Sequence, residues 1–331
     1  MKILVTGASG FIGSFIVEEA LKKGFDTWAA VRKSSSKAYL QDPRINFIEL
    51  NFNDEAELKE QLKDHQFDYI VHAAGVTKCL NHQDFFRMNT EGTKNLVKAI
   101  LALDMKVQKF VFISSLSIFG NIRDKKPYLN ILLTDTPKPN TDYGRSKLQA
   151  EEFLFTVKDK LNFTILRPTG VYGPREKDYF LMAQSIKQHV DFAAGWSQQD
   201  ITFVYVQDVV QAVFLALKQT QSGKAYFLSD GEVYESATFS RLIRKELGNP
   251  WWLRITAPIW LLRTICAIGD KWGQMTGTIS ALNNDKFHIL AQRNWRCDVD
   301  SAVQDLGYHP EVKLEEGVKR SIKWYKENGW L

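Results

Sequence analysis

Short apolar runs alternate with helical patterns over the first half of this 331-residue chain. The first run covers residues 2–6, and residues 11–23 then carry apolar side chains at helical spacing until Gly24. Five further apolar runs follow, with helical stretches between them, at residues 27–31, 45–50, 69–73, 110–114 and 163–167. This alternation predicts an α/β fold built on a doubly wound parallel sheet.

The second half of the chain has a different pattern, because helical periodicity dominates from residue 178 onward. We therefore expect a sheet domain over residues 1–177 and a smaller, mostly helical region over residues 178–331, interleaved with the last sheet elements at about 201–230. Strand-like pieces in this half include residues 202–206 and 225–228. Seven of the nine tryptophans follow Pro250, which indicates an apolar lid or interface.

Residues 258–275 predict an amphipathic helix. Apolar side chains recur along one side at helical spacing, at Leu261, Ile265, Ile268, Trp272 and Met275. Three charged residues within the segment argue against a membrane span, which needs about 20 nearly uncharged residues. Three interpretations stay open: a core helix with its stripe buried, a cover over an apolar substrate pocket, or a helix that touches a membrane surface.

Charge and cysteine content exclude several classes of protein. The net charge of +5 comes from 43 basic and 38 acidic residues that are interspersed, with no basic run that could follow a nucleic-acid backbone. Cys79, Cys266 and Cys297 are an odd number without metal-ligand spacing, so we expect free thiols, no disulfide and no metal site. The N-terminal apolar stretch is interrupted by glycines and forms the first strand, so we expect a cytoplasmic protein.

The sequence TGASGFIG follows the first apolar run and sets Gly7, Gly10 and Gly13 three residues apart. In such a turn the first glycine permits the tight bend, the second lets the backbone approach a pyrophosphate, and the third lets the helix pack closely on the strand. The phosphates then meet the N-terminus of the helix. This combination of strand, turn and helix predicts a dinucleotide site.

A second motif, YGRSK, sets Tyr143 and Lys147 four residues apart, so both side chains project from one face of a helix. A phenol with a reference pKa of about 10 is a poor acid at neutral pH. A neighbouring ammonium group, together with a positively charged oxidised nicotinamide, would lower the pKa of Tyr143. We therefore predict that the pair transfers a proton.

The ordered set of motifs resembles the extended short-chain dehydrogenases/reductases of the NAD-dependent epimerase/dehydratase type. The resemblance runs over nearly the whole chain and rests on TGASGFIG, HAAG from His72, NTEGT from Asn89, ISSLSIFG from Ile113, YGRSK, RPTGVYGP and LGYHP. It implies a Rossmann fold with a C-terminal substrate-binding region. It also implies a homodimer, paired through the helices expected at residues 93–103 and 147–157.

The resemblance implies a role for each catalytic residue. Tyr143 would protonate a carbonyl oxygen while hydride arrives from the nicotinamide, and Lys147 would hold ribose hydroxyls. The hydroxyl that binds the reacting oxygen corresponds to Ser115, at the end of a predicted strand, with Ser117 as a neighbouring substrate contact. Asn89 would lie near the nicotinamide, and its alternative role is a helix cap.

The turn after the second strand, AAVRKSSSK, bears on the choice of cofactor. An acidic residue there would bind the adenine ribose of NAD, but Arg32 takes its place, and Lys33 and Lys37 add charge that suits a 2′-phosphate. We predict NADP(H), with NAD(H) as the alternative if this turn is ordinary solvated surface. Asn51 stands near the expected adenine site, where an aspartate is common. By position, the resemblance adds cofactor contacts at Ser9, Phe11, Ile12, Asn53, Ala73, Ala74, Pro168 and Tyr172.

The absence of two motifs argues against two branches of the family. The chain has Leu116 and Ser117 where dehydratases have an Asp-Glu pair. It has QRNWRCDVD where nucleotide-sugar epimerases commonly have an Arg-x-Gly-Asp segment, although Arg293 or Arg296 could still meet an anion. The basic turn and the aromatic C-terminal part match the dihydroflavonol reductase and 3β-hydroxysteroid dehydrogenase branch. We predict an oxidoreductase that interconverts a ketone and a secondary alcohol on a sterol-, lipid- or flavonoid-like small molecule. The alternatives are a nucleotide-sugar epimerase with tightly bound NAD and a non-catalytic dinucleotide-binding sensor.

Overall fold

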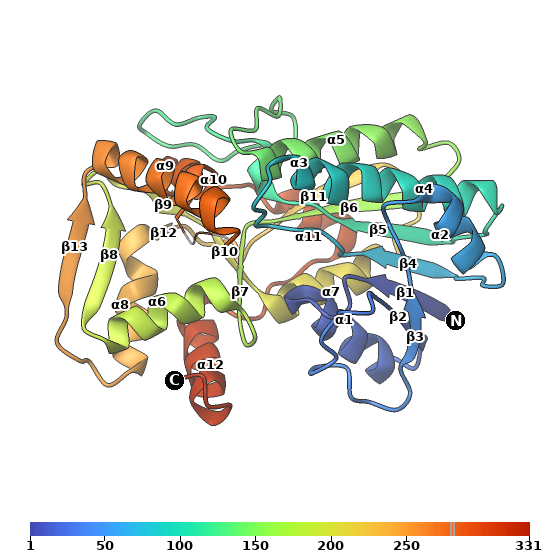
Figure 1. Ribbon diagram of the computed structural model, residues 1–331, viewed down its shortest axis with the longest axis horizontal. Helices are drawn as coiled ribbons and strands as arrows, with labels where there is room; N and C mark the ends of the chain where they lie inside the picture. Colours follow the sequence, from blue (N-terminus) through green and yellow to red (C-terminus); the bar gives the residue numbers. More distant parts are fainter. Residues whose placement is uncertain (279, 281) are drawn as a thin grey trace.

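The computed structural model describes residues 1–278, 280 and 282–331. Its centre is a seven-stranded parallel sheet in the order β11-β6-β5-β4-β1-β2-β3, with helices on both faces (Figure 1). The strands are β1 (Lys2–Thr6), β2 (Asp26–Val31), β3 (Asn46–Glu49), β4 (Tyr69–His72), β5 (Lys109–Ile113), β6 (Phe163–Pro168) and β11 (Lys224–Leu228). The predicted doubly wound Rossmann sheet is confirmed.

Each face of the sheet has its own apolar core, because successive residues of a strand point to opposite sides. Ile3 and Val5 of β1 belong to the core that includes α1 (Phe11–Lys22) and α7 (Val206–Ala216). Leu4 belongs to the core on the other face, where the helices are α2 (Glu55–Leu62), α4 (Gly92–Ala102) and α5 (Asp142–Thr156). Helices on both faces leave β5 fully buried, which explains why its sequence is a continuous apolar run after Lys109.

The strand order reverses beside β1, since β2 and β3 lie on one side of it and β4 to β6 on the other. In open parallel sheets, ligands bind at the carboxyl ends of the strands next to such a reversal. The segments that follow β1, β4 and β5 therefore meet at one edge. The short helices in those segments are α3 (Gln83–Phe85), the π-helix η1 (Phe86–Glu91) and the 3-10 helix η2 (Leu116–Ile118).

The C-terminal part is mostly helical, as predicted, and packs around a third core that is rich in aromatic residues. Tyr172, Phe203, Tyr205, Phe239 and Tyr325 are buried there. Its further elements are β7 (Gly170–Tyr172), α6 (Lys177–Lys187), β8 (Val190–Ala194), β9 (Asp200–Ile201), β10 (Phe203–Tyr205), β12 (Tyr234–Glu235), α8 (Ser236–Glu246), β13 (Leu253–Ala257), α9 (Ile259–Thr276), α10 (Asn284–Ala291), β14 (Asn294–Trp295), α11 (Asp300–Leu306) and α12 (Leu314–Glu327).

The two strand-like pieces predicted in this half form strands of two different sheets. Residues 225–228 lie in β11, which returns to the edge of the central sheet beside β6. Residues 203–205 form β10, which pairs with β7 outside the central sheet, and Val206 already begins α7. Among the described residues, we find no helix of the length and apolarity that a bilayer crossing requires.

Candidate active site

The glycine turn after β1 has the geometry that its spacing predicts. Gly7 has a φ of +67°, and a Cβ there would lie 2.7 Å from backbone atoms of Ala73 and Ala74 at the end of β4. A Cβ at Gly13 would overlap the carbonyl oxygen of Gly7. These two positions therefore require glycine, because β1, β4 and the start of α1 approach one another at backbone distance.

The start of α1 offers donors for an anion. Gly10 is the N-cap of this helix and has no side chain to satisfy the first-turn amides, so no described side chain caps the helix and the N–H groups of Phe11 and Ile12 can donate to a ligand. Ser9, Phe11 and Ile12 are half-buried along the same turn, and Gly10 is exposed. The close backbone contacts and the uncapped helix fit the pyrophosphate of a dinucleotide.

A directed chain of buried hydrogen bonds connects β1 to the segment that carries Asn89. Thr6 Oγ1 lies 2.7 Å from His72 Nδ1 and accepts the N–H of Ala74. His72 Nε2 lies 3.0 Å from Thr93 Oγ1, whose hydroxyl donates to the carbonyl oxygen of Asn89 at 2.6 Å. This order is satisfied when Nε2 of His72 carries the proton. Burial lowers the pKa of His72 to about 3, so the ring stays neutral and acts as a structural bridge.

Asn89 lies in η1 and joins the segment after β4 to helix α5. Its Oδ1 accepts the N–H of Val76 at 2.8 Å, and its Nδ2 donates to the Val76 carbonyl and to Ser146 Oγ, each at 3.0 Å. The Ser146 hydroxyl donates in turn to the carbonyl oxygen of Tyr143. The structure thus brings Asn89 to the site. Its side-chain amide, however, is hydrogen-bonded to Val76 and Ser146 and so helps to fix the position of α5.

Lys147 is buried at the carboxyl end of β5. Its Nζ donates to the carbonyl oxygen of Ile113 at 2.8 Å and lies 4.7 Å from the centre of the Phe112 ring. Burial lowers the pKa of Lys147 to about 8, although the Glu151 carboxylate one turn further along α5 opposes this. A Cβ at Gly75 would lie 3.2 Å from Nζ, so the glycine of the HAAG motif leaves room for the ammonium group.

Tyr143 is half-buried and faces Ser115 across the end of β5. We expected Lys147 and an oxidised nicotinamide together to lower the pKa of Tyr143. Among the groups of the protein itself, burial raises this pKa and a hydrogen bond with Ser115 opposes the rise in part, while the ammonium group of Lys147 is directed to the Ile113 carbonyl. The Ser115 hydroxyl donates to Ser117 Oγ and accepts the Ser117 N–H, both at 3.1 Å. Tyr143, Ser115 and Ser117 therefore lie together.

The segment after β6 departs from expectation at Tyr172. We expected this side chain near the nicotinamide, but it is fully buried in the aromatic core, where a Cβ on Gly317 of α12 would overlap its ring. Its side chain is therefore not available to a ligand at the sheet edge. Pro168 ends β6, directly beside β5, and is buried in register with Leu228.

The basic turn after β2 is open to solvent. Arg32, Lys33 and Lys37 are all exposed, and within the described ranges none of them forms an ion pair with a carboxylate. Lys37 Nζ lies over the Phe47 ring, 4.1 Å from its centre. Asn53 is exposed, whereas Asn51 accepts the Asn53 N–H and donates to Glu57, so Asn51 shapes the turn.

Comparison with known proteins agrees with this geometry. A model of the NAD dependent epimerase/dehydratase family matches residues 3–233. The chain belongs to this family. Similar members are UDP-glucose 4-epimerase of Vibrio cholerae, 27% identical over 97% of this chain and 94% of that protein, and sterol-4-alpha-carboxylate 3-dehydrogenase of Candida albicans, 23% identical over 98% of each. UDP-glucose 4-epimerase of Thermotoga maritima has the same fold, with a TM-score of 0.79, 22% identity and 99% coverage of both chains.

This member of the NAD-dependent epimerase/dehydratase family is an NAD(P)-dependent enzyme of the extended short-chain dehydrogenase/reductase type. Its glycine turn, its buried lysine and its tyrosine lie at one edge of the sheet. They meet through Ala73, Ala74 and Gly75, which follow β4 and touch both the glycine turn and Lys147. The arrangement can bind a dinucleotide and exchange a proton with a substrate oxygen.

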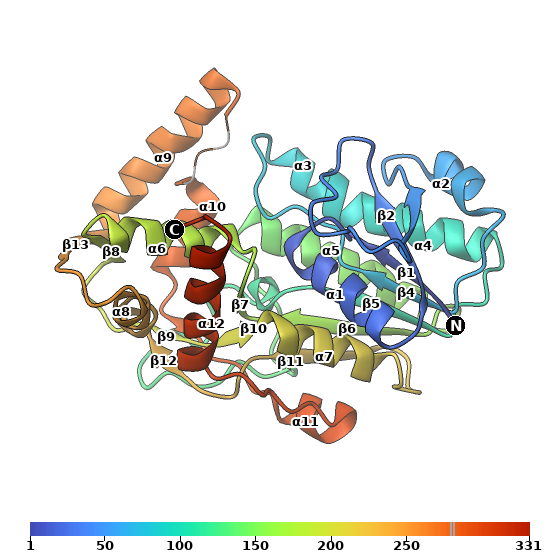
Figure 2. The ribbon, with the colours of Figure 1, turned by 90° about the horizontal axis from the view of Figure 1, so that it is seen from below.

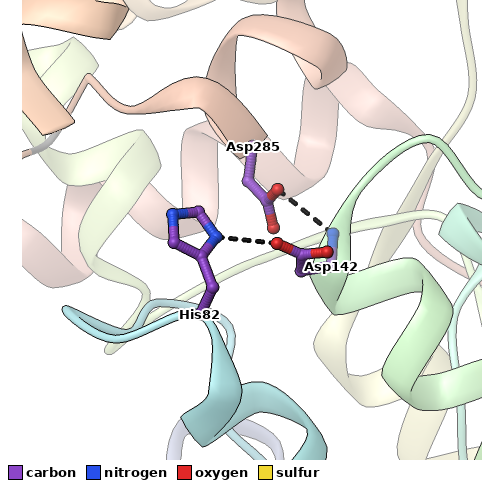
Figure 3. Close-up of side chains that lie close together, drawn as sticks. All are labelled: His82, Asp142 and Asp285. Carbon is purple, nitrogen blue, oxygen red and sulfur yellow. Dashed lines mark hydrogen bonds and ion pairs between the residues drawn. The ribbon is translucent and has the colours of Figure 1, made fainter.

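The protein also has a cluster of titratable side chains that sequence analysis missed. His82, Asp142 and Asp285 come from three distant segments, and the Asp285 carboxylate accepts the N–H of Asp142 at the start of α5 (Figure 3). The same carboxylate also accepts the N–H of Tyr143. Asp142 bonds to His82 Nδ1 and to the Arg145 guanidinium, each at 2.7 Å. We expected no metal site. Three ligand atoms here lie within 4.8 Å of one another, but all three carry hydrogen bonds within the protein that a cation would have to displace.

Proposed function

We propose that this protein is an NADP(H)-dependent oxidoreductase that interconverts a ketone and a secondary alcohol on a largely apolar or medium-sized molecule. The observation that carries the proposal is the meeting of Ser115, Tyr143 and Lys147 at the carboxyl end of β5. A proton donor, a hydroxyl that can bind oxygen, and a buried cation at one edge are the groups that carbonyl reduction requires.

The residues of this chain would act on the substrate oxygen, and a bound nicotinamide would supply or accept the hydride. Because burial raises the pKa of Tyr143, the phenol stays protonated at neutral pH and can give its proton to the oxygen as negative charge develops there. Ser115 would donate to the same oxygen by turning its hydroxyl away from Ser117 Oγ, while its oxygen keeps the bond that it accepts from the Ser117 N–H. Lys147, charged below a pH of about 8, would donate to ribose hydroxyls.

The preference for NADP(H) is supported by the basic turn. Arg32, Lys33 and Lys37 offer three exposed cations where an acidic residue would exclude a 2′-phosphate. A guanidinium group pairs well with a phosphate dianion because it presents several donors in one plane. Arg32 is therefore the residue to which we assign the main contact with that phosphate.

We assign substrate binding to residues 178–331, apart from the elements at about 201–230 that accompany the sheet. An apolar substrate is favoured over a nucleotide sugar because Arg293 donates to the Ala194 carbonyl and Arg296 pairs with Asp200. A diphosphate would have to displace these bonds. Likeness to the Vibrio cholerae UDP-glucose 4-epimerase makes a nucleotide-sugar epimerase the second candidate.

The experiment that tests the proposal is an assay of the purified protein with NADPH. Steroid ketones, long-chain ketones and sugar nucleotides are offered in parallel, and oxidation of NADPH is followed beside a Tyr143→Phe control. We expect turnover with one of the apolar ketones. Interconversion of a sugar nucleotide without net NADPH oxidation, by protein that purifies with NAD bound, would favour the epimerase instead.

The homodimer stays a prediction. The helices that would pair, α4 and α5, lie together on one face of the sheet (Figure 1). Light scattering of the purified protein measures the oligomeric state directly, and a negative charge introduced at the exposed Phe155 of α5 by Phe155→Glu should weaken a dimer formed there.

A further inference from the structure

Most of the large hydrophobic side chains that are exposed in the described part of the chain lie in two neighbouring segments. These segments are residues 192–196, which include the second half of β8, and the described part of residues 251–282, which includes β13 and α9. Scattered exposed hydrophobic residues are normal on a protein surface, but a contiguous group of them marks an interaction site. This contiguous group of exposed side chains is therefore a candidate interaction surface.

Helix α9 buries only one of its two apolar sides. Leu262 and Cys266 are buried, and a Cβ at Gly269 would overlap the carbonyl oxygen of Leu282, so this side packs closely on the chain that returns to α10. The opposite side is exposed. We call it the α9 outer face, and it consists of Trp260 (70% exposed), Ile265 (40%), Ile268 (61%), Trp272 (65%) and Met275 (82%). Of the three interpretations that the sequence left open, the core helix with its stripe buried is therefore wrong.

The paired strands β8 and β13 extend the exposed apolar surface. Phe192 and Ile255 are exposed neighbours in register, and Leu253 lies on the same side of its strand two residues earlier. Alternate residues point the other way, where Arg254 forms an ion pair with the buried Asp191 at 3.1 Å. β13 runs directly into α9, so the two exposed surfaces are neighbours along the chain, and α9 projects from the body of the molecule (Figure 2).

Charge at the edge of the α9 outer face is positive. Arg263 and Lys271 are both exposed, whereas the single acidic residue of the helix, Asp270, accepts the N–H of Asn284 at the start of α10. A helix with tryptophans near both ends of an apolar face and cations beside it has the composition of helices that lie in the interface of a bilayer. Such a helix is attracted to anionic headgroups.

We propose that the α9 outer face, with the exposed side of β8 and β13, docks on a bilayer that contains anionic lipid. The 18 residues of α9 span about 27 Å, which is the length of an element that lies in the membrane plane with its apolar side among the acyl chains. Trp260 and Trp272 lie at the headgroup level, while Arg263 and Lys271 face the lipid phosphates. The proposal does not depend on the oxidoreductase activity.

Vesicle flotation tests the proposal with the full chain. Vesicles of phosphatidylcholine, with and without phosphatidylglycerol, are centrifuged with the protein, and the bound fraction gives a partition coefficient. We expect binding to the anionic vesicles that weakens at high salt. Ile268→Glu should lower the partition coefficient about tenfold on both kinds of vesicle. Lys271→Glu should lower it by a similar factor on the anionic vesicles only.

The matched control is Val303→Glu, which introduces the same charge at an exposed position of α11 and should leave binding unchanged. Circular dichroism and thermal melting verify that each variant folds. The proposal is overturned if the protein binds neither kind of vesicle, or if Ile268→Glu binds as well as the original chain. It is also overturned if Ile268→Glu dissociates a dimer in protein that does not bind vesicles, because the surface would then join two copies of this chain.

Discussion

The carboxylate of Asp285 accepts the backbone N–H of Tyr143 at 3.2 Å, although the two residues lie 142 positions apart in the sequence. The same carboxylate accepts the N–H of Asp142, so a residue of α10 caps the helix that carries the candidate proton donor. The C-terminal region is thereby fastened to the catalytic helix at its first turn.

Asp285→Asn should slow turnover more than it affects cofactor binding. The amide keeps the size of the side chain but loses the charge and one acceptor, which weakens a helix cap by about 1 kcal/mol and lets the start of α5 move. We expect kcat to fall about fivefold while the affinity for NADPH is unchanged.

The control for this prediction is Asp54→Asn. Asp54 also accepts two backbone N–H groups at a helix start, in α2, next to the expected adenine contact Asn53 and not in the helix that carries Tyr143. It should cost similar stability without loss of kcat. Equal kcat values for the two variants would show that Asp285 is only a structural cap.

Binding of NADPH should weaken as the pH rises through about 8. Burial lowers the pKa of Lys147 to about this value, so the ammonium group is present below it and is lost above it, together with its donors to the ribose. Fluorescence titration across the pH range measures the effect. Lys147→Met has a side chain of similar length without charge, and it should bind weakly at every pH without the transition. A transition that persists in Lys147→Met would assign it to another group.

Gly13→Ala should lower the affinity for NADPH by at least about tenfold, because the new Cβ would overlap the Gly7 carbonyl oxygen and move α1 away from the turn. Gly24, at the other end of α1, supplies the control. Its φ is +77° and a Cβ there would meet no atom within 4 Å, so Gly24→Ala should cost about 1 kcal/mol of stability and leave binding intact. Unchanged affinity in Gly13→Ala would contradict the assigned dinucleotide site.

Arg32→Ser should lower the affinity for NADPH about tenfold to a hundredfold and leave that for NADH unchanged. The variant removes the charged hydrogen bonds to a 2′-phosphate, each worth about 1.5 to 3 kcal/mol. Stopped-flow fluorescence with both reduced cofactors measures the two affinities, and Lys106→Ser, at an exposed cation after α4, is the control. Tighter binding of NADH than of NADPH by the original chain would overturn the preference.

Local patterns were sufficient to predict the sheet and the central part of the site. The glycine spacing requires close backbone approach, and the structure shows it at Gly7 and Gly13. The four-residue spacing of Tyr143 and Lys147 puts both on one helix, whatever surrounds that helix. The exposure of Arg32 likewise follows from its position in a turn between two strands.

Features that depend on distant segments could not be predicted in this way. The inward direction of Tyr172 is set by Gly317 on α12, which leaves space for its ring. Asp285 carries no local signal, because its partners are two backbone amides of another helix. The amphipathic pattern of α9 predicted a helix with an apolar side, but periodicity does not reveal what that side faces, and Ile268 is exposed.

The most direct test of the proposed chemistry compares Tyr143→Phe with the original chain in two assays, the dissociation constant for NADPH and kcat with the substrate that the panel identifies. We predict an unchanged dissociation constant and a kcat that falls at least about a hundredfold, because phenylalanine fills the same space but has no proton to give. A variant that binds NADPH and keeps kcat within about a factor of ten would show that Tyr143 is not the proton donor.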